Sequence, residues 1–190
     1  MTEQQLCTAT DLAAAIDRIA DAIVSDFGSP DAPEYALVGL YRAGVPLAER
    51  LLETIIRRGA KPPVLGKLDV TMYRDDIGLR RTLPQIRETI LPFNMEGAQV
   101  ILVDDVLSSG RTIRAALDAL TAFGRPALIR LAVLIDRDNA EYPIRPDYVG
   151  MRIEVPEDRK IVVSLPDDPA AAVAYTVPAA PVGQSTPTQA

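Results

Sequence analysis

The stretch VILVDDVLSSGRT, residues 100–112, decides the fold. Its first four residues are apolar, as in a strand that is buried on both faces, and Asp104 and Asp105 follow them. A short turn rich in serine comes next. Residues Thr112 to Phe123 then have helical periodicity, and Gly124 follows as a helix stop. A buried strand leading directly into a helix is typical of an α/β fold with a parallel sheet.

The same stretch predicts a site for a sugar phosphate. Asp104 and Asp105 would lie at the carboxyl edge of the sheet, where open α/β folds bind ligands. Residues 108–112 would present backbone N–H groups and hydroxyls at a helix N-terminus, which suits a phosphate monoester. An ordinary helix cap beside a solvated acid pair is the alternative interpretation. A P-loop is excluded because GxxxxGK[ST] is absent.

The flanking sequence continues the alternation of strands and helices. We expect helices at 10–27 and 45–58, and strands at 35–40, 64–73, 99–103, 128–135, 148–153 and 160–165. Residues 74–97 are charged and interrupted by proline and glycine. We expect a lid at 76–92, because long loops in a compact domain tend to be functional.

The organisation predicted for the chain is one domain with a tail. Residues 1–165 would form the α/β domain, and residues 166–190 are rich in proline and alanine without Lys or Arg. Such a composition favours a largely disordered tail, or a strand edge near Tyr175 followed by one.

The composition of the 190 residues excludes several classes of chemistry. The absence of histidine removes Ser-His-Asp and Cys-His catalysis and every His-ligated metal site. The single cysteine, Cys7, excludes an internal disulfide and fits a reducing cytoplasm. A formal net charge of −6 argues against a generally basic nucleic-acid binder and leaves room for a local basic patch. The sequence contains no apolar run near the roughly 20 residues that a membrane span needs.

Several motifs resemble one family. VILVDDVLSSGRT is similar to the signature of type I phosphoribosyltransferases, which bind 5-phosphoribosyl pyrophosphate (PRPP). The segments LDVTMYRDD (68–76), GRPALIRLAVLIDR (124–137) and YPIRPDYVG (142–150) resemble the PyrR family, pyrimidine operon attenuation regulators that are also uracil phosphoribosyltransferases. VGLYRAGVPLAERL (38–51) resembles the pyrophosphate loop of that family and its following helix. The resemblance implies the type I phosphoribosyltransferase fold, with a mainly parallel sheet, flanking helices and a small hood of C-terminal strands.

The resemblance also implies roles for individual residues. Asp104 and Asp105 would contact the ribose hydroxyls, and Arg74 would reach the diphosphate. The PRPP site would comprise Arg42, Ala43, Gly44, Asp104, Asp105, Val106, Leu107, Ser108, Ser109, Gly110, Arg111 and Thr112. The base would lie near Ile135, Asp136, Arg137, Tyr148 and Val149. Mg²⁺ would be bound through substrate and water, with Asp104 as the candidate for a direct ligand.

The implied reaction joins uracil N1 to ribose C1 with loss of pyrophosphate, which yields UMP and needs no nucleophilic side chain. A homodimer or higher homo-oligomer is expected. Three alternatives stay open: a purine salvage transferase with the same PRPP motif, a UMP-sensing RNA regulator with vestigial catalysis, and a sugar-phosphate-binding domain without an assignable reaction. An activity assay with uracil and with hypoxanthine distinguishes the purine salvage transferase from the uracil enzyme, because the purine enzyme should not use uracil.

Family members also bind the leader mRNA of the pyrimidine operon when UMP is present. The first helix and the loop after the LxDR strand are usually basic there, whereas the first 27 residues here hold five acids and a single base, Arg18. The loop reads DRDNAE (136–141), where the family commonly has Gly-His-Arg after the Asp-Arg pair. The remaining RNA-binding candidates are Arg18, Arg137, Arg145 and Arg152. A transferase that has lost RNA binding is therefore the alternative to the bifunctional protein.

Overall fold

The computed structural model describes residues 3–74 and 86–179, and a five-stranded parallel sheet forms its centre. The strand order is β3-β2-β4-β5-β6, and each neighbouring pair is parallel. The strands are β2 (Tyr35–Leu40), β3 (Val64–Leu68), β4 (Gln99–Leu107), β5 (Leu128–Asp136) and β6 (Tyr148–Arg152). Because all five run the same way, their carboxyl ends meet at one edge, and the predicted α/β class is confirmed.

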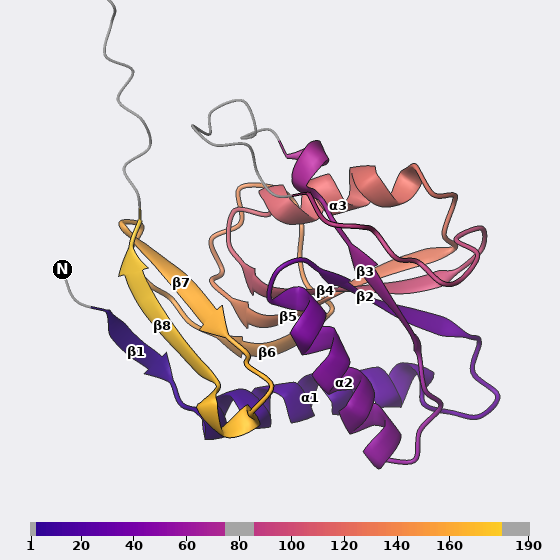
Figure 1. Cartoon of the computed structure of the whole chain (residues 1–190), viewed down its shortest axis with the longest axis horizontal. Helices are drawn as coiled ribbons and strands as arrows, with labels where there is room; N and C mark the ends of the chain where they lie inside the picture. Colours follow the sequence, from indigo (N-terminus) through magenta and orange to yellow (C-terminus); the bar gives the residue numbers. More distant parts are fainter. Residues whose placement is uncertain (1–2, 75–85, 180–190) are drawn as a thin grey trace, which may run out of the picture.

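Helices cover both faces of this sheet (Figure 1). The helices α1 (Ala9–Phe27) and α2 (Gly44–Arg57) pack on one face, and α3 (Arg111–Thr121) packs on the other. Alternate residues of β4 accordingly enter different cores. Ile101 and Val103 join the core beneath α1 and α2, and Val100 and Leu102 join the core beneath α3. The continuous apolar run in the sequence reflects this double burial.

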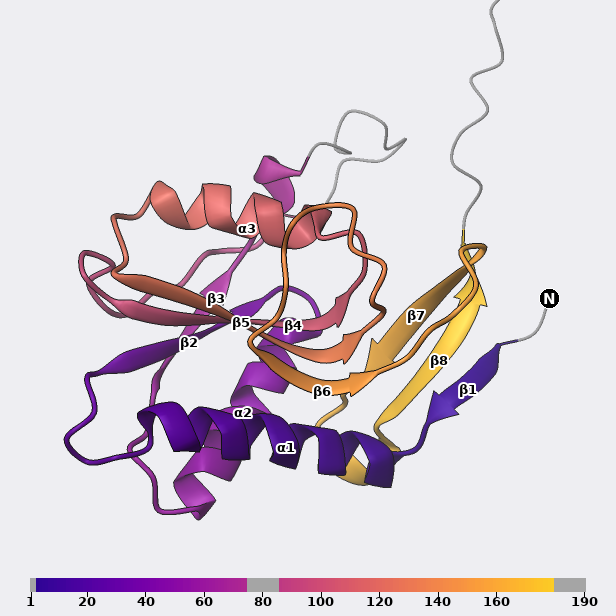
Figure 2. The same cartoon turned by 180° about the vertical axis from the view of Figure 1, so that it is seen from behind.

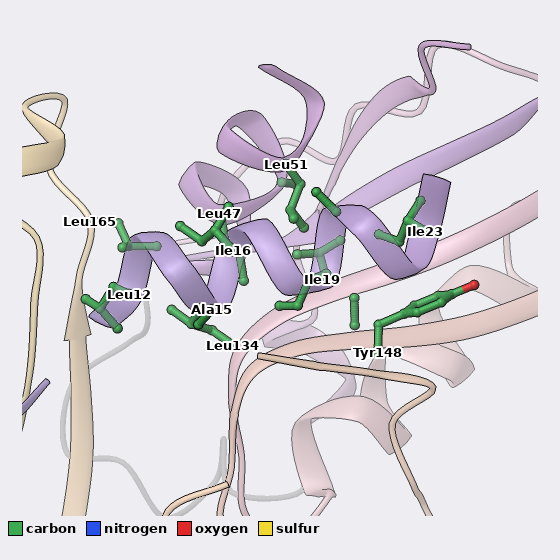
Figure 3. Close-up of a cluster of buried hydrophobic side chains, with 14 of the residues drawn as sticks. Leu12, Ala15, Ile16, Ile19, Ile23, Leu47, Leu51, Leu134, Tyr148 and Leu165 are labelled. Carbon is green, nitrogen blue, oxygen red and sulfur yellow. The ribbon is translucent and has the colours of Figure 1, made fainter. Parts of the chain in front are cut away.

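The first helix begins at a capping box and ends before Gly28. The Thr8 side chain accepts a hydrogen bond from the Asp11 N–H, and the Asp11 carboxylate accepts one from the Thr8 N–H. Its buried stripe recurs at helical spacing and comprises Leu12, Ala15, Ile16, Ile19, Ala20, Ile23 and Phe27. Figure 3 shows five of them, Leu12, Ala15, Ile16, Ile19 and Ile23, clustered with side chains of α2 and of the sheet. This packing anchors α1 across the sheet and fixes its exposed face.

A second, three-stranded antiparallel sheet forms the predicted hood (Figures 1 and 2). Its order is β1-β8-β7, with β1 (Gln4–Cys7), β7 (Arg159–Ser164) and β8 (Val173–Pro178). The short N-terminal strand was not predicted. The anticipated strand near Tyr175 is β8, which lies beyond the expected boundary at residue 165 and belongs to the hood sheet. Residues 180–190 of the expected tail lie outside the described residues.

The strand expected at 64–73 ends early, at Leu68, and a 3-10 turn (Thr71–Tyr73) follows it. The chain returns at Ile90, which exchanges two backbone hydrogen bonds with Lys67 at 2.7 and 2.8 Å. Residues 75–85, where much of the expected lid falls, lie outside the described residues. Within the described ranges, the helices are too short or too polar to cross a membrane.

Candidate active site

A cavity of about 870 Å³ lies between the carboxyl edge of the main sheet and the hood. It brings together ten residues predicted for the site: Arg42, Ala43, Arg74, Asp104, Asp105, Val106, Ser108, Ser109, Thr112 and Arg137. These residues come from the loop after β2, the 3-10 turn after β3, the end of β4, the turn into α3 with the start of that helix, and the end of β5. The parallel sheet therefore assembles the site from segments that are distant in sequence.

The two carboxylates of β4 line this cavity, Asp104 buried and Asp105 half-buried. Asp104 is 7% exposed, and its Oδ1 accepts a hydrogen bond of 3.1 Å from the Asp105 N–H. Burial, followed by the neighbouring charge of Asp105, raises the pKa of Asp104 well above its usual value. Burial also raises the pKa of Asp105, although hydrogen bonds and the charge of Lys160 act in the opposite direction. Burial therefore disfavours ionisation of both carboxyl groups together.

These properties fit a divalent cation that arrives with its substrate. Carboxylate oxygens are hard ligands of the kind Mg²⁺ takes, and Mg²⁺ at phosphate substrates is commonly held by one or two carboxylates. The described residues contain no cluster of three or more acidic, Cys or His side chains that could form a complete metal site. The donor set matches an ion held jointly by Asp104, Asp105, substrate and water.

The turn between β4 and α3 has the form of a phosphate cradle. Gly110 adopts φ 88°, a left-handed conformation that glycine accommodates without strain, and α3 begins at the next residue. A hollow of about 60 Å³ at this helix N-terminus is lined by residues 104 and 106–113. Thr112 receives a 2.8 Å hydrogen bond at Oγ1 from Nη1 of Arg74. The arrangement can hold an anion between backbone N–H groups and hydroxyls.

The loop after β2 packs directly on β4 because it contains glycine. A Cβ on Gly44 would lie 2.4 Å from the carbonyl oxygen of Val103, so only glycine fits there. This close approach places Arg42 and Ala43 in the cavity wall, while Gly44 lies beneath it. The peptide bond between Tyr41 and Arg42 is cis. Of the three residues predicted for this loop, two thus line the cavity.

Arg137 forms part of the wall at the end of β5. It is 8% exposed, and its guanidinium donates to Ser108 Oγ at 3.3 Å and to the carbonyls of Val155 and Pro156 at 3.4 and 3.3 Å. Burial lowers the pKa of Arg137. The side chain therefore links the phosphate turn to the segment between β6 and β7. Its buried position also means that it cannot share an exposed RNA-binding surface with the other candidates.

The other residues predicted to bind the base do not line the cavity. Tyr148 pairs with Ala132 at the beginning of β6, whereas Arg152 lies level with Asp136 at the carboxyl edge. The Tyr148 hydroxyl donates to Asp26 at 2.8 Å. This register explains why the predicted contacts of Tyr148 and Val149 with the base are not supported, since both lie toward the opposite end of the strand. Ile135 and Asp136 are buried behind the wall.

Several cavity residues were not assigned to the site from the sequence. Asp69, Thr71 and Arg87 line it beside the PRPP candidates, and Arg159 and Lys160 reach it from β7 of the hood. The segment LDVTMYRDD was a signal for the first two residues. The adjacent basic residues Arg159 and Lys160, at the start of the expected strand at 160–165, were a weak signal for the hood. Only the tertiary fold brings them to the cavity that the carboxylates line.

The remaining RNA candidates lie on the outside of the molecule. Arg18 of α1 donates a hydrogen bond to the carbonyl of Gly150 in the edge strand β6. The Arg152 side chain on the same strand is 68% exposed, with its Nε 3.6 Å from a carboxylate oxygen of Asp136. Arg145 is exposed. The acidic face of α1 is partly neutralised, because Arg58 forms salt bridges of 3.2 and 2.7 Å with Asp17 and Asp21.

Comparisons with known proteins identify the family of the chain. Residues 4–170 match the phosphoribosyl transferase domain family. A protein of Roseiflexus sp. (strain RS-1) named Bifunctional protein PyrR is 50% identical over 168 residues, which cover 87% of this chain and 89% of that protein. The Thermus aquaticus protein of the same name is 45% identical over 161 residues, which cover 85% and 87% of the two chains.

Solved structures support the fold independently. The hypoxanthine-guanine phosphoribosyltransferase of Bacillus anthracis superposes with a TM-score of 0.63 at 20% identity, covering 83% of this chain and 86% of that chain. At this identity the likeness bears on the fold alone, and it confirms the predicted phosphoribosyltransferase fold. The match to the domain family and the identity to its relatives establish that the chain belongs to the PyrR family of phosphoribosyltransferase-domain proteins.

Proposed function

We propose that this chain is a uracil phosphoribosyltransferase that converts uracil and PRPP to UMP and pyrophosphate, and that with UMP bound it regulates a pyrimidine operon through its leader mRNA. The observation that carries the enzymatic proposal is the joint position of the carboxylate pair and the phosphate turn on one cavity. Asp104 and Asp105 stand at the end of β4, and the turn to α3 follows within a few residues. This spacing suits a ribose whose 5-phosphate occupies the turn.

The charges around the cavity suit the proposed displacement. Positive charge develops on the ribose as C1 separates from the diphosphate, and negative charge leaves with pyrophosphate. Arg42, Arg74 and Arg87 line the cavity and would stabilise the leaving group, because fixed cations act most strongly where charge develops. Asp104 and Asp105 would accept hydrogen bonds from the ribose hydroxyls and stabilise the electron-poor sugar. Uracil N1 forms the new bond to C1 as the bond from C1 to the pyrophosphate oxygen breaks, and the N1 proton is released to solvent.

The proposed cofactor is Mg²⁺, held by the substrate, by water and by Asp104 or Asp105. When bound it would neutralise part of the diphosphate charge. Burial raises the pKa values of the two carboxyl groups, and a cation held beside them would favour their ionised forms. Magnesium removal should consequently abolish UMP formation without unfolding the protein.

Base preference decides between the proposal and a purine salvage enzyme. The wild-type chain would be incubated with PRPP, Mg²⁺ and equimolar uracil, hypoxanthine or guanine, and the nucleotides separated by chromatography. UMP as the single product supports the proposal. IMP or GMP without UMP would establish purine salvage, and a protein that binds PRPP without forming any nucleotide would be a regulator with vestigial catalysis.

The proposed RNA contact involves Arg18, Arg145 and Arg152. Arg18 contacts the edge strand β6, which also carries Arg152. A homodimer would present two copies of such a patch. The function requires the cytoplasm, where the nascent transcript is formed. Binding of the leader transcript of its own pyrimidine genes would be measured with and without UMP over a salt series, against a scrambled transcript of equal length. Absence of binding at low salt, in a preparation that forms UMP, would favour a transferase that has lost RNA binding.

A further inference from the structure

Asp69 occupies a central place beside the cavity, and none of the roles described above uses it. It follows β3 directly and is half-buried in the cavity wall. One carboxylate oxygen accepts the Thr71 N–H at 2.7 Å, and the other accepts the Arg87 N–H, from a residue 18 positions further along the chain. The Asp69 N–H in turn donates to Thr89 Oγ1 at 3.1 Å. One residue therefore fixes two chain segments.

Each of these segments carries an arginine of the cavity wall. The turn that starts at Thr71 leads to Arg74, whose guanidinium reaches Thr112 of the phosphate turn. On the other side, the Arg87 guanidinium lies 5.1 Å from the centre of the Tyr41 ring, next to Arg42. Burial alone raises the pKa of Asp69, but hydrogen bonds from Thr71 and Arg87 and the charge of Arg87 lower it overall. The residue is thus held as an ionised acceptor.

We propose that Asp69 is a positioning residue that orients Arg74 and Arg87 toward the diphosphate of PRPP. This inference rests on the proposed function for the identity of the ligand. The hydrogen bonds of Asp69 join it to Thr71, Arg87 and Thr89, the segments that carry the two arginines, so its effect should be specific for ligands that carry a diphosphate. UMP lacks the diphosphate, so the affinity of the protein for UMP should not change when Asp69 is replaced.

The test compares Asp69→Asn with a matched control, Asp147→Asn. The Asp147 carboxylate also accepts a backbone hydrogen bond, from Leu131 at 2.9 Å, but at the opposite edge of the sheet. In Asp69→Asn one acceptor becomes an NH₂ group that faces a backbone N–H. We expect a rise in the KM for PRPP of about tenfold, equivalent to about 1.4 kcal/mol, with the KM for uracil and the affinity for UMP within about twofold of wild type. Asp147→Asn should leave all three unchanged.

A second variant and a binding measurement make the test independent of Asp69→Asn alone and of catalytic turnover. Thr89→Val is nearly isosteric and removes the acceptor for the Asp69 N–H, and it should raise the KM for PRPP in the same direction but less. Calorimetric titration with magnesium pyrophosphate needs no turnover and should show weaker binding in both variants. Wild-type affinity for pyrophosphate in both would overturn the inference, as would an equal loss of affinity for UMP. A wild type that binds pyrophosphate and forms no UMP would instead refute the proposed function, while the titrations still decide the role of Asp69.

Discussion

Replacement of Asp104 by asparagine should stabilise the ligand-free protein while it impairs catalysis. The carboxylate is 7% exposed and adjoins the half-buried carboxylate of Asp105; burial and this neighbouring charge raise its pKa well above the ordinary value of 3.8. Asparagine keeps the oxygen that accepts the Asp105 N–H and removes the charge. Relief of one poorly compensated buried charge is worth about 1–3 kcal/mol. At about 2–4 °C per kcal/mol for a chain of this size, the Tm at pH 7.5 should rise by about 2–12 °C.

The direction in which the Tm difference changes with pH follows from the raised pKa of Asp104. Between pH 3.8 and the raised pKa, the folded state of the wild type binds more protons than the unfolded state. Stability of the wild type is therefore lost as pH rises through that window, whereas Asp104→Asn lacks this loss. The Tm difference between variant and wild type should widen as pH rises above the ordinary carboxyl pKa, level off once pH passes the raised pKa of Asp104, and shrink toward zero as pH falls to the ordinary value.

Differential scanning calorimetry without ligand, at several pH values, measures this difference. Asp118→Asn is the control, because this carboxylate on α3 is 56% exposed and pairs with Arg114 on the surface. Its Tm should follow the wild type closely. The turnover of Asp104→Asn should fall by about two orders of magnitude, the usual effect of removing a group that stabilises the transition state. A variant that melts below the wild type at pH 7.5, or a Tm difference independent of pH, would refute the reasoning.

Three further predictions concern other parts of the site. Gly44→Ala should lower the free energy of unfolding by about 1–3 kcal/mol in a denaturant titration, because its Cβ would meet the Val103 carbonyl oxygen at 2.4 Å; unchanged stability would contradict that packing. Arg74→Ala should raise the KM for PRPP about tenfold because its hydrogen bond to Thr112 and its charge are lost, and steady-state kinetics with an unchanged KM would exclude the contact. Arg145→Gln should reduce the salt slope of UMP-dependent RNA binding by about one with UMP synthesis intact, and an unchanged slope would remove this residue from the RNA surface.

The fold and the centre of the site were accessible from local patterns. The VILV run indicates double burial by its lack of alternation, and the acid pair and the serine-rich turn follow it in sequence. Strand, carboxylates and cradle are neighbours along the chain, so no knowledge of long-range packing was needed to place them together. The same holds for the buried stripe of α1, whose spacing directly reflects its contacts.

Features that depend on pairing between distant segments were not accessible in this way. Tyr148 looked like a base contact because its motif resembles the family, but the register of β6 against β5 places it at the far end of the strand. The polar sequence of β1 does not indicate a strand, since its partner β8 lies at the other end of the chain. The role inferred for Asp69 likewise depends on the return of the chain at Arg87.

The most direct test of the central claim is UMP formation by the double variant Asp104→Asn with Asp105→Asn. Labelled uracil, PRPP and Mg²⁺ would be supplied at saturating concentrations, and circular dichroism and thermal melting would verify the fold of each preparation. The account predicts that the wild type forms UMP and that the folded double variant forms none above the uncatalysed background. Turnover of the double variant at the wild-type rate would contradict the assignment of this carboxylate pair to the PRPP site.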